Sequence, residues 1–91
     1  MTLTIAGTNF DQHQYDDRGD VLYLSVGPPR EAARTIATPE GHAVDYDESG
    51  TVMGMVLVNV RFILERDGML TLSLPPEHLD AAALQPILVA A

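Results

Sequence analysis

The chain has 91 residues, a formal net charge of −8 at pH 7 and no cysteine. This length allows one domain with a modest core, and the missing cysteine excludes disulfides, thiolate metal sites and thiol nucleophiles. The five cations are all arginines and are scattered, so the composition argues against nucleic-acid binding. No segment resembles a signal peptide or a membrane span, so we expect a cytoplasmic protein. The lysine-free composition points to a GC-rich bacterial source.

The N-terminal part predicts one edge strand and one hairpin. Residues 2–5 alternate between polar and apolar side chains, and Gly7-Thr8-Asn9 is expected to break that strand. Residues 12–15 and 21–26 flank an Asp-rich turn and are typical of two hairpin strands. The side chains expected to face the core are Leu22, Leu24 and Val26.

The middle of the chain predicts a second set of antiparallel strands. Gly27-Pro28 ends the preceding strand, because proline donates no hydrogen bond to a strand ladder. Residues 34–38 and 42–46 follow as strands, with a turn at 39–41 between them. A turn ending in Ser49-Gly50 then leads into the longest apolar run, residues 51–60.

The 51–60 run is apolar on both sides, and such a strand is normally covered on both sides. One side is expected to carry Val52, Val56, Val58 and Val60 together with Gly54. The opposite side is expected to carry Met53, Met55 and Leu57. Since methionine adapts to irregular surfaces, we predict a homodimer whose interface contains these last three residues. The alternative is that the strands after Arg61 cover that side within one chain.

The C-terminal part predicts two more strands and one helix. Residues 61–64 are expected to continue the long strand after a bend, and Asp67-Gly68 is a strong two-residue hairpin signal. Leu70, Leu72 and Leu74 then alternate with polar residues as an inward-facing row. Pro75-Pro76-Glu77 predicts the start of a short helix, which Pro86 is expected to end. The predicted fold class is α+β: one domain over residues 1–91, with a twisted, mainly antiparallel β-sheet of hairpins and one short C-terminal helix.

One turn sequence occurs twice, 31 residues apart. Residues 15–22 and 46–53 share the order Tyr, Asp, acid, any residue, Gly, any residue, Val, apolar residue. We predict equivalent hairpin turns in which Gly19 and Gly50 both have positive φ. Two copies are too few for a repeat protein, so shared turn chemistry is the simpler explanation.

These strands and turns resemble a known family. The segments are Tyr-Asp at 15–16, Asp-Val-Leu-Tyr-Leu at 20–24, Val-Asp-Tyr-Asp-Glu-Ser-Gly at 44–50 and Val-Met-Gly-Met-Val-Leu at 52–57. They are similar to the small bacterial domain-of-unknown-function family 2283 over about residues 13–60. The resemblance implies a mainly antiparallel β domain of unassigned function, and it raises an antitoxin role beside a small ribonuclease-type toxin. The chain departs from the family pattern at Val56, where an acid is usual, and the part from Arg61 onward has no counterpart in short members.

The candidate metal and catalytic patterns are incomplete. Asp45, Asp47 and Ser49 match the start of a calcium loop, but the twelfth position holds Val56 instead of a glutamate. The histidines are His13, His42 and His78, none at a helical ligand spacing. A zinc site is conceivable only if His13 and His42 meet across neighbouring strands, with Asp16 or Asp45 nearby. We therefore predict no metal, no cofactor and no catalytic residues.

The sequence thus favours a non-enzymatic interaction module that self-associates. The chief rival is an acidic, antitoxin-like protein that binds a small basic toxin, since an acidic domain suits a basic partner. A small metal-dependent enzyme is the third hypothesis. Neither nucleic acid nor a membrane is an expected partner.

Overall fold

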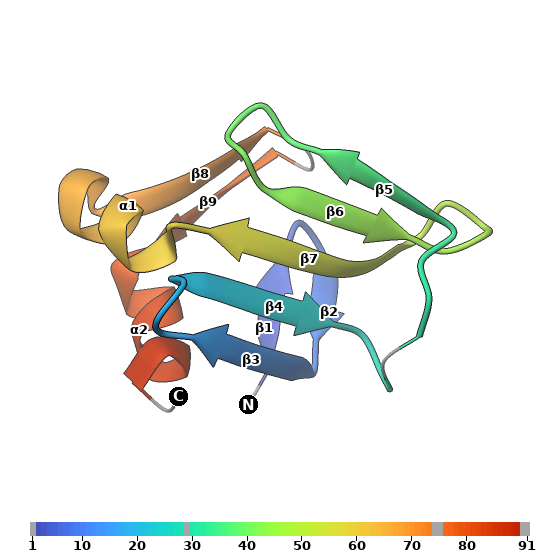
Figure 1. Cartoon of the computed structure of the whole chain (residues 1–91), viewed down its shortest axis with the longest axis horizontal. Coiled ribbons are helices and arrows are strands. Elements are labelled where there is room, and N and C mark those ends of the chain that lie inside the picture. The colour runs from blue at the N-terminus through green and yellow to red at the C-terminus, as the bar shows by residue number, and fades with distance from the viewer. Residues whose placement is uncertain (1, 29, 74–75, 90–91) are drawn as a thin grey trace.

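The structure, a computed structural model, describes residues 2–28, 30–73 and 76–89. Its centre is a five-stranded antiparallel sheet in the order β3-β4-β7-β6-β5 (Figure 1). The strands are β3 (Gln12–Asp16), β4 (Val21–Ser25), β5 (Arg34–Ala37), β6 (Ala43–Tyr46) and β7 (Val52–Val58). All five lie where the sequence predicted strands, to within two residues at each end.

Two antiparallel ribbons and two helices complete the chain. They are β1 (Leu3–Ile5) with β2 (Thr8–Phe10), β8 (Met69–Ser73) with β9 (Pro76–Asp80), α1 (Val60–Asp67) and α2 (Ala81–Val89). In Figure 1 both ribbons lie behind the sheet, and both helices lie at one end of it. The α+β class with a mainly antiparallel sheet is confirmed, with one helix more than predicted. No helix among the described residues is long and apolar enough to span a bilayer.

The core lies between the sheet and the two ribbons. Leu22, Val44 and Leu57 from the sheet are fully buried. They share one buried cluster with Phe10 from the first ribbon and Leu70 from the second. Strand alternation explains this arrangement, because every second side chain of a strand points to the same face. One face of the sheet is therefore covered within the chain.

Strand β2 was not predicted. The first strand ends at Ile5, before Gly7, as predicted, but Thr8 and Asn9 belong to a second strand, β2, which pairs back onto β1. The turn consists of Ala6 and Gly7, whose φ angles are 49° and 85°. A two-residue hairpin turn with positive φ at both positions is favourable for strand pairing. Alanine rarely adopts positive φ, so Ala6-Gly7 could not be recognised as a hairpin turn from the sequence.

Residues 61–64 form part of helix α1, so the prediction of a continued strand there is wrong. Asn59 has a left-handed backbone (φ 58°), which ends the extended run, but its side chain makes no capping bond. The cap comes from Asp20 in the β3–β4 turn. Its carboxylate accepts hydrogen bonds from the backbone N–H groups of Arg61 and Phe62 at 2.8 and 3.0 Å. A carboxylate at this end also suits the positive pole of the helix dipole.

After residue 64 the sequence predicted a hairpin turn at Asp67-Gly68 and a helix start at residues 75–77, and the structure shows neither. Gly68 has φ 77° and donates its N–H to the Leu64 carbonyl at 2.9 Å, so Asp67-Gly68 ends α1 and is not the predicted hairpin turn. The predicted helix start at 75–77 is also wrong, because Pro76 begins strand β9. Of the predicted inward row, Leu70 and Leu72 are buried, whereas Leu74 lies outside the described residues, as does Pro75.

Helix α2 begins at Ala81, after Asp80 accepts a capping hydrogen bond from the Ala83 N–H at 2.9 Å. Pro86 lies inside this helix, so the prediction that it ends the helix is wrong. A proline removes one intrahelical hydrogen bond and disfavours a helix interior. Here the helix continues for only three further residues, and the fully or nearly buried Ile87 and Leu88 anchor that last turn in the core.

The two similar turns differ in backbone conformation. Gly50 has φ 85°, as predicted. Gly19 does not have a positive φ, and its neighbour Asp20 does instead, at 55°. The prediction of equivalent turns is therefore wrong. Asp20 adopts this conformation because the Val60 N–H contacts its carbonyl and the α1 backbone holds its carboxylate.

Candidate functional site

The face of the five-stranded sheet opposite the core carries an apolar surface that no other described element covers (Figure 1). Tyr23 pairs with Val56, Val56 pairs with Ala43, and Val21 pairs with Val58, so these side chains share one face. Tyr23 is 46% exposed, and the three valines are half-buried. We call this surface the open face. Its apolar side chains are Val21, Tyr23, Ala37, Ala43, Val56 and Val58, and the same register places Gln12, Gln14, Asp16, Ser25, Thr35 and Asp45 on it.

Gly54 leaves the row of the open face between Ser25 and Asp45 without a side chain on β7. A Cβ atom at this position would lie 3.0 Å from the Leu24 carbonyl oxygen and 3.3 Å from the Asp45 carboxylate. Asp45 in turn accepts a hydrogen bond from the Thr35 hydroxyl at 2.6 Å. By the strand register, the charged side chains on this face are Asp45 and Asp16, both acidic. The open face is therefore apolar along its central row, low at the neighbouring Gly54 row, and acidic in its charge.

The three residues predicted to form an interface are buried within the chain and do not lie on the open face. Met53, Met55 and Leu57 are 6%, 1% and 0% exposed, and the last two belong to the main core cluster. The chain itself covers them, which is the alternative that the sequence had left open. These three side chains are thus not available to a partner, and their assignment to an interface is corrected.

The valine row expected on the opposite side is also shorter than predicted. The β6–β7 register shifts between Asp45 and Tyr46, and Val52 packs against the core. Val60 is fully buried at the start of α1. Only Val56 and Val58 of that predicted row lie on the open face. A bulge of this kind rotates the residues beyond it relative to a regular strand.

A family model described as "Protein of unknown function (DUF2283)" matches residues 13–61, which is just over half of the chain. The chain belongs to the DUF2283 family. No curated protein and no solved structure matches it. The DUF2283 segment runs from β3 to the first residues of α1 and so contains the five-stranded sheet except for Gln12, the first residue of β3. Apart from Gln12, the open face is built from this segment, whereas both ribbons and α2 lie outside it.

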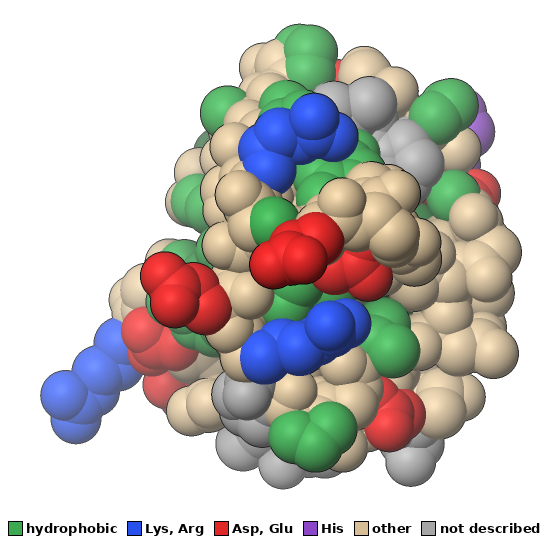
Figure 2. All heavy atoms as spheres, turned by 90° about the vertical axis from the view of Figure 1, so that its right-hand side faces the viewer, with side chains coloured by type: hydrophobic (Ala, Val, Ile, Leu, Met, Phe, Trp, Pro, Cys, Tyr) green, Lys and Arg blue, Asp and Glu red, His purple; other side chains and the backbone are tan. Residues whose placement is uncertain are grey.

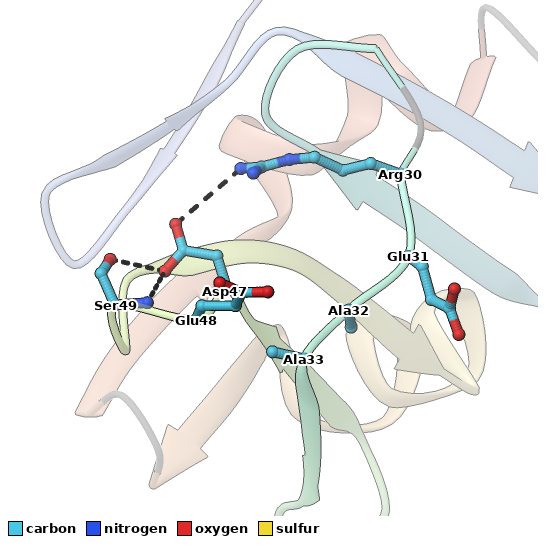
Figure 3. A pocket seen from close by; sticks show the side chains of 7 residues that line it. All are labelled: Arg30, Glu31, Ala32, Ala33, Asp47, Glu48 and Ser49. Atoms are coloured by element: carbon cyan, nitrogen blue, oxygen red, sulfur yellow. Dashed lines mark hydrogen bonds and ion pairs between the residues drawn. The ribbon is translucent and has the colours of Figure 1, made fainter.

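A shallow cleft lies at the end of the DUF2283 sheet where β6 turns into β7. Its volume is about 490 Å³, and Arg30, Asp47 and Ser49 are among the residues that line it (Figure 3). Figure 2 looks onto this end of the molecule and shows acidic side chains lying between basic ones. The Arg30 guanidinium lies 3.9 Å from the Asp47 carboxylate, but both side chains are solvated, so this pair contributes little.

Asp47 shapes the turn beside this cleft. Its carboxylate accepts hydrogen bonds from the Ser49 hydroxyl and N–H at 2.6 and 2.9 Å, and from the Thr51 N–H at 3.0 Å. The bond from the Ser49 hydroxyl, followed by that from the Thr51 N–H, lowers the pKa of Asp47 below its ordinary value. These contacts are those of an Asx turn, which is the role that the sequence chemistry gives to Asp and Ser. The hydrogen bonds beside the cleft are therefore those of a turn, and the described residues that line it do not include a paired nucleophile and base.

The histidines are separated by the DUF2283 sheet. His13 lies on β3 and His42 directly precedes β6, and strands β4 and β7 lie between them. The predicted condition for a zinc site, that these two histidines meet across neighbouring strands, is therefore not met. His78 lies on β9 within 3.2 Å of the Thr71 hydroxyl. Among the described residues, no group of three or more His, Cys, Asp or Glu side chains is placed to hold a metal ion.

A polar cluster that the sequence did not indicate joins Tyr15, Asp20 and Arg61. The Tyr15 hydroxyl donates to the Asp20 carboxylate at 2.6 Å, and the Arg61 guanidinium lies 5.1 Å from the centre of the Tyr15 ring. Burial, together with the hydrogen bond to Asp20, raises the pKa of Tyr15 to about 12. Burial opposes ionisation of Asp20, but the hydrogen bonds from Tyr15 and the α1 backbone lower its pKa overall. Tyr15 thus stays protonated at neutral pH, and the cluster fastens α1 to the sheet.

Proposed function

We propose that this DUF2283 protein is a non-enzymatic interaction module that forms a homodimer through its open face. The observation that carries the proposal is the apolar row from Tyr23 through Val56 to Ala43, which crosses the centre of the sheet. Contiguous apolar surface of this kind on a folded chain is typical of an interaction site. A second copy of the same sheet is the proposed partner.

The dimensions of the molecule suit this partner. The view of Figure 1, along the shortest axis, looks onto the open face, and the other two dimensions are 36 and 26 Å. The outline of the whole molecule thus exceeds the ~800 Å² per partner of a standard interface, and the open face occupies the part of it that the five strands span. Two flat sheets pack face to face about 10 Å apart when their facing side chains are small or interlocking. Gly54 and Ala43 are small enough to allow this close approach, and Tyr23 supplies the large side chain that fills the space between the two sheets.

The apolar side chains supply the stabilisation. A fully buried aliphatic side chain contributes ~1.5–3 kcal/mol relative to an exposed one. Val21, Val56 and Val58 are already half-buried, so each gains only part of this value. Because both subunits contribute the same row, several such partial gains add up and offset the entropy lost on association. We expect a dimer of moderate affinity.

The acidity of the chain does not require a basic partner. The chain has 13 carboxylates, and nine of them accept hydrogen bonds from other described residues and so serve turns, caps and contacts between elements. They are Asp11, Asp16, Asp20, Glu40, Asp45, Asp47, Asp67, Glu77 and Asp80. An antitoxin-like role with a basic toxin is the rival proposal, and the net charge of −8 is what supports it.

The salt dependence of association separates the two proposals. Two copies of an acidic chain repel each other, so screening by NaCl should strengthen a homodimer that is held by apolar contacts. A complex with a basic protein should weaken under the same screening. Sedimentation velocity of the purified protein at low and high NaCl measures the first effect. Monomers at every salt concentration would overturn the homodimer, and a basic protein that co-purifies at low salt and leaves at high salt would favour the rival.

The small metal-dependent enzyme remains the third proposal, and metal analysis of the protein purified without chelators tests it. Stoichiometric zinc or another transition metal would support it. We also propose a bacterial, cytoplasmic setting, for which the composition of the chain is the support.

A further inference from the structure

We infer that protonation of His42 releases the end of β7 and so displaces Val58 from the open face, which makes dimerisation sensitive to acid. The effect on dimerisation rests on the homodimer proposed above. His42 directly precedes β6 and is almost completely buried, with 2% of its surface exposed. Its Nδ1 accepts a hydrogen bond from the Val58 N–H at 2.9 Å, which joins the end of β7 to the start of β6.

The bond from Val58 fixes the protonation state of the His42 ring. A ring nitrogen that accepts a hydrogen bond carries no proton, so the proton of the neutral ring resides on Nε2. Nε2 is buried and has no hydrogen-bond partner among the described residues. A second proton would have to bind Nδ1, where it would point at the Val58 N–H. The charged ring thus finds no acceptor at either nitrogen among the described residues, and a buried charge without a partner is costly.

The backbone of His42 is held in place independently of its ring. Its N–H donates to the Thr38 hydroxyl at 3.1 Å, and its carbonyl accepts a hydrogen bond from the Thr38 N–H at 2.8 Å. Thr38 is itself buried, with 6% of its surface exposed. Since neither bond involves the imidazole, both persist when the ring becomes charged. The contact that has to separate is therefore the one between the ring and Val58.

The charged groups around the ring do not stabilise an imidazolium. Those that line one cavity together with His42 are Glu40 in the β5–β6 loop and Arg66 and Asp67 on α1, and the β8 residues there are uncharged. Both Glu40 oxygens already accept hydrogen bonds from Ser73, and Arg66 is paired with Asp67 at 2.7 Å. Burial lowers the pKa of His42, and the attraction of Glu40 opposes this effect only in part. The native fold therefore favours the neutral ring.

His42 is connected to the open face through two residues. Ala43 follows it directly, and Val58 donates the bond to its ring, so His42 fixes β6 and β7 relative to each other at one corner of that face. Val58 pairs there with Val21. When the ring separates from Val58, the position of this pair is no longer fixed. A dimer that packs on the pair is therefore fully stabilised above about pH 6.5, the ordinary pKa of histidine, and weakens as the pH falls below it.

The net charge of the chain predicts the opposite pH dependence. At pH 7 the chain carries a formal charge of −8, and acidification makes this charge less negative. Repulsion between two copies then decreases, so net charge alone would make the dimer tighter in acid. A dimer that becomes weaker in acid would have to be explained by a specific group.

Nuclear magnetic resonance of Val56→Arg tests the release of β7 without a dimer, because this variant is expected to be a folded monomer. Tyr23→Arg, at another exposed position of the open face, takes its place if Val56→Arg does not fold. Between about pH 8 and pH 5, we expect the ¹⁵N signals of His42 to change from those of the neutral Nε2–H form to those of the imidazolium. The Val58 amide signal and the Val21 and Val58 methyl signals should move with the same midpoint. Valine signals that stay unchanged, or a His42 ring that becomes charged only as the whole chain unfolds or not at all, would overturn the inference.

Sedimentation velocity at high NaCl tests the effect on the dimer. From about pH 7.5 to pH 5.5 the dissociation constant of the wild type should rise by up to ~100-fold, the limit for one proton per subunit one pH unit below 6.5. His42→Gln, which keeps an acceptor oxygen for the Val58 N–H, should abolish this rise, whereas His13→Gln should retain it. A wild-type dimer that is equally tight or tighter in acid overturns the inference. A wild type that is monomeric at both pH values overturns the homodimer, and the magnetic resonance titration then decides alone whether His42 releases β7.

Discussion

The Asp20 carboxylate lies 2.8 Å from the backbone nitrogen of Arg61, so a turn of the first sheet hairpin caps a helix 41 residues later. The same carboxylate accepts the Tyr15 hydroxyl hydrogen bond at 2.6 Å. Asn59, which precedes the helix, makes no side-chain cap of its own. The DUF2283 segment ends at this contact, at residue 61. Asp20 therefore ties the sheet to the C-terminal part of the chain that covers its inner face.

Asp20→Ala should lower the free energy of unfolding by ~2 kcal/mol, the upper end of the range for a lost helix cap. The loss is large because alanine also tolerates the positive φ of this position poorly. Asp20→Gly relieves the backbone strain but still loses the cap, and Asp20→Asn keeps both a tolerant backbone and one acceptor oxygen. Urea denaturation should rank the variants in stability as Asn, then Gly, then Ala. Asp17→Ala, an exposed change in the same turn, is the control, and an equal loss from it would contradict the capping role.

The two turn glycines should respond differently to alanine. Gly50→Ala should cost ~1 kcal/mol or more, because it forces a side chain into φ 85°. Gly19→Ala should cost under ~0.5 kcal/mol, since its φ is not positive and the nearest atom, 3.0 Å away, ends the exposed Asp16 side chain. Denaturant midpoints of the two variants measure the difference. Equal losses would show that the turns are equivalent after all.

Most of the strands were predictable because the information that specifies them is local in the sequence. Alternating side chains and turn residues locate β3 to β7 and β8 from the sequence alone. Helix α1 was not predictable, because its cap is Asp20, which is distant in sequence. At the C-terminus, Pro75-Pro76-Glu77 is typical of a helix start, yet pairing with β8 makes Pro76 the first residue of a strand. At this position the pairing of β9 with β8 overrides the local preference for a helix start.

The candidate site was only partly predictable for the same reason. The sequence showed that the 51–60 run was apolar on both sides, but not which side the chain itself would cover. Residues outside the DUF2283 segment, such as Phe10 and Leu70, cover Met55 and Leu57. The open face, with Val56 at its centre, is what remains. The sequence raised His42 as a possible zinc ligand and favoured an exposed or singly bonded histidine, but its actual partner, the Val58 N–H, is visible only in the fold.

Stability should fall as the pH drops below about 6.5, the ordinary pKa of histidine. The pKa of His42 is lowered in the folded chain, so the unfolded chain takes up this proton first and is favoured. Above that pH the ring is neutral in both states and the stabilisation is complete. One proton gives a slope of at most ~1.4 kcal/mol per pH unit. The charged neighbours of the ring are Glu40, Arg66 and Asp67.

Urea midpoints between about pH 8 and pH 5 measure this effect, a range in which ordinary carboxylates remain ionised. His42→Gln should remove this part of the pH dependence, whereas His13→Gln should keep it. Parallel profiles for the wild type and His42→Gln would show that His42 does not cause the decline.

Calcium and zinc should not raise the melting temperature. Asp47 Oδ1 accepts the hydrogen bonds from Ser49 and Thr51, and Asp45 Oδ1 accepts the bond from the Thr35 hydroxyl, so one oxygen of each carboxylate is engaged. A ligand present at a hundred times its dissociation constant would add ~2.7 kcal/mol to stability. Thermal melts with each ion, and again after addition of chelator, measure this. A rise that the chelator reverses would contradict the prediction.

Homodimerisation through the open face should depend on the centre of that face. Val56→Arg places a long charged side chain in the middle of the apolar row, so it should separate the subunits without unfolding them, because this residue lies outside the core cluster. Phe62→Asp is the matched control. Phe62 is 56% exposed on α1, outside the strands that form the open face, so this change also removes a large exposed apolar side chain.

Light scattering coupled to gel filtration, at high protein concentration and elevated NaCl, is the most direct measurement. The chain mass is 9.9 kDa. The wild type and Phe62→Asp should elute with twice that mass, and Val56→Arg should elute as a folded monomer. A wild type that remains monomeric, or a Val56→Arg variant that remains dimeric, would contradict self-association through the open face.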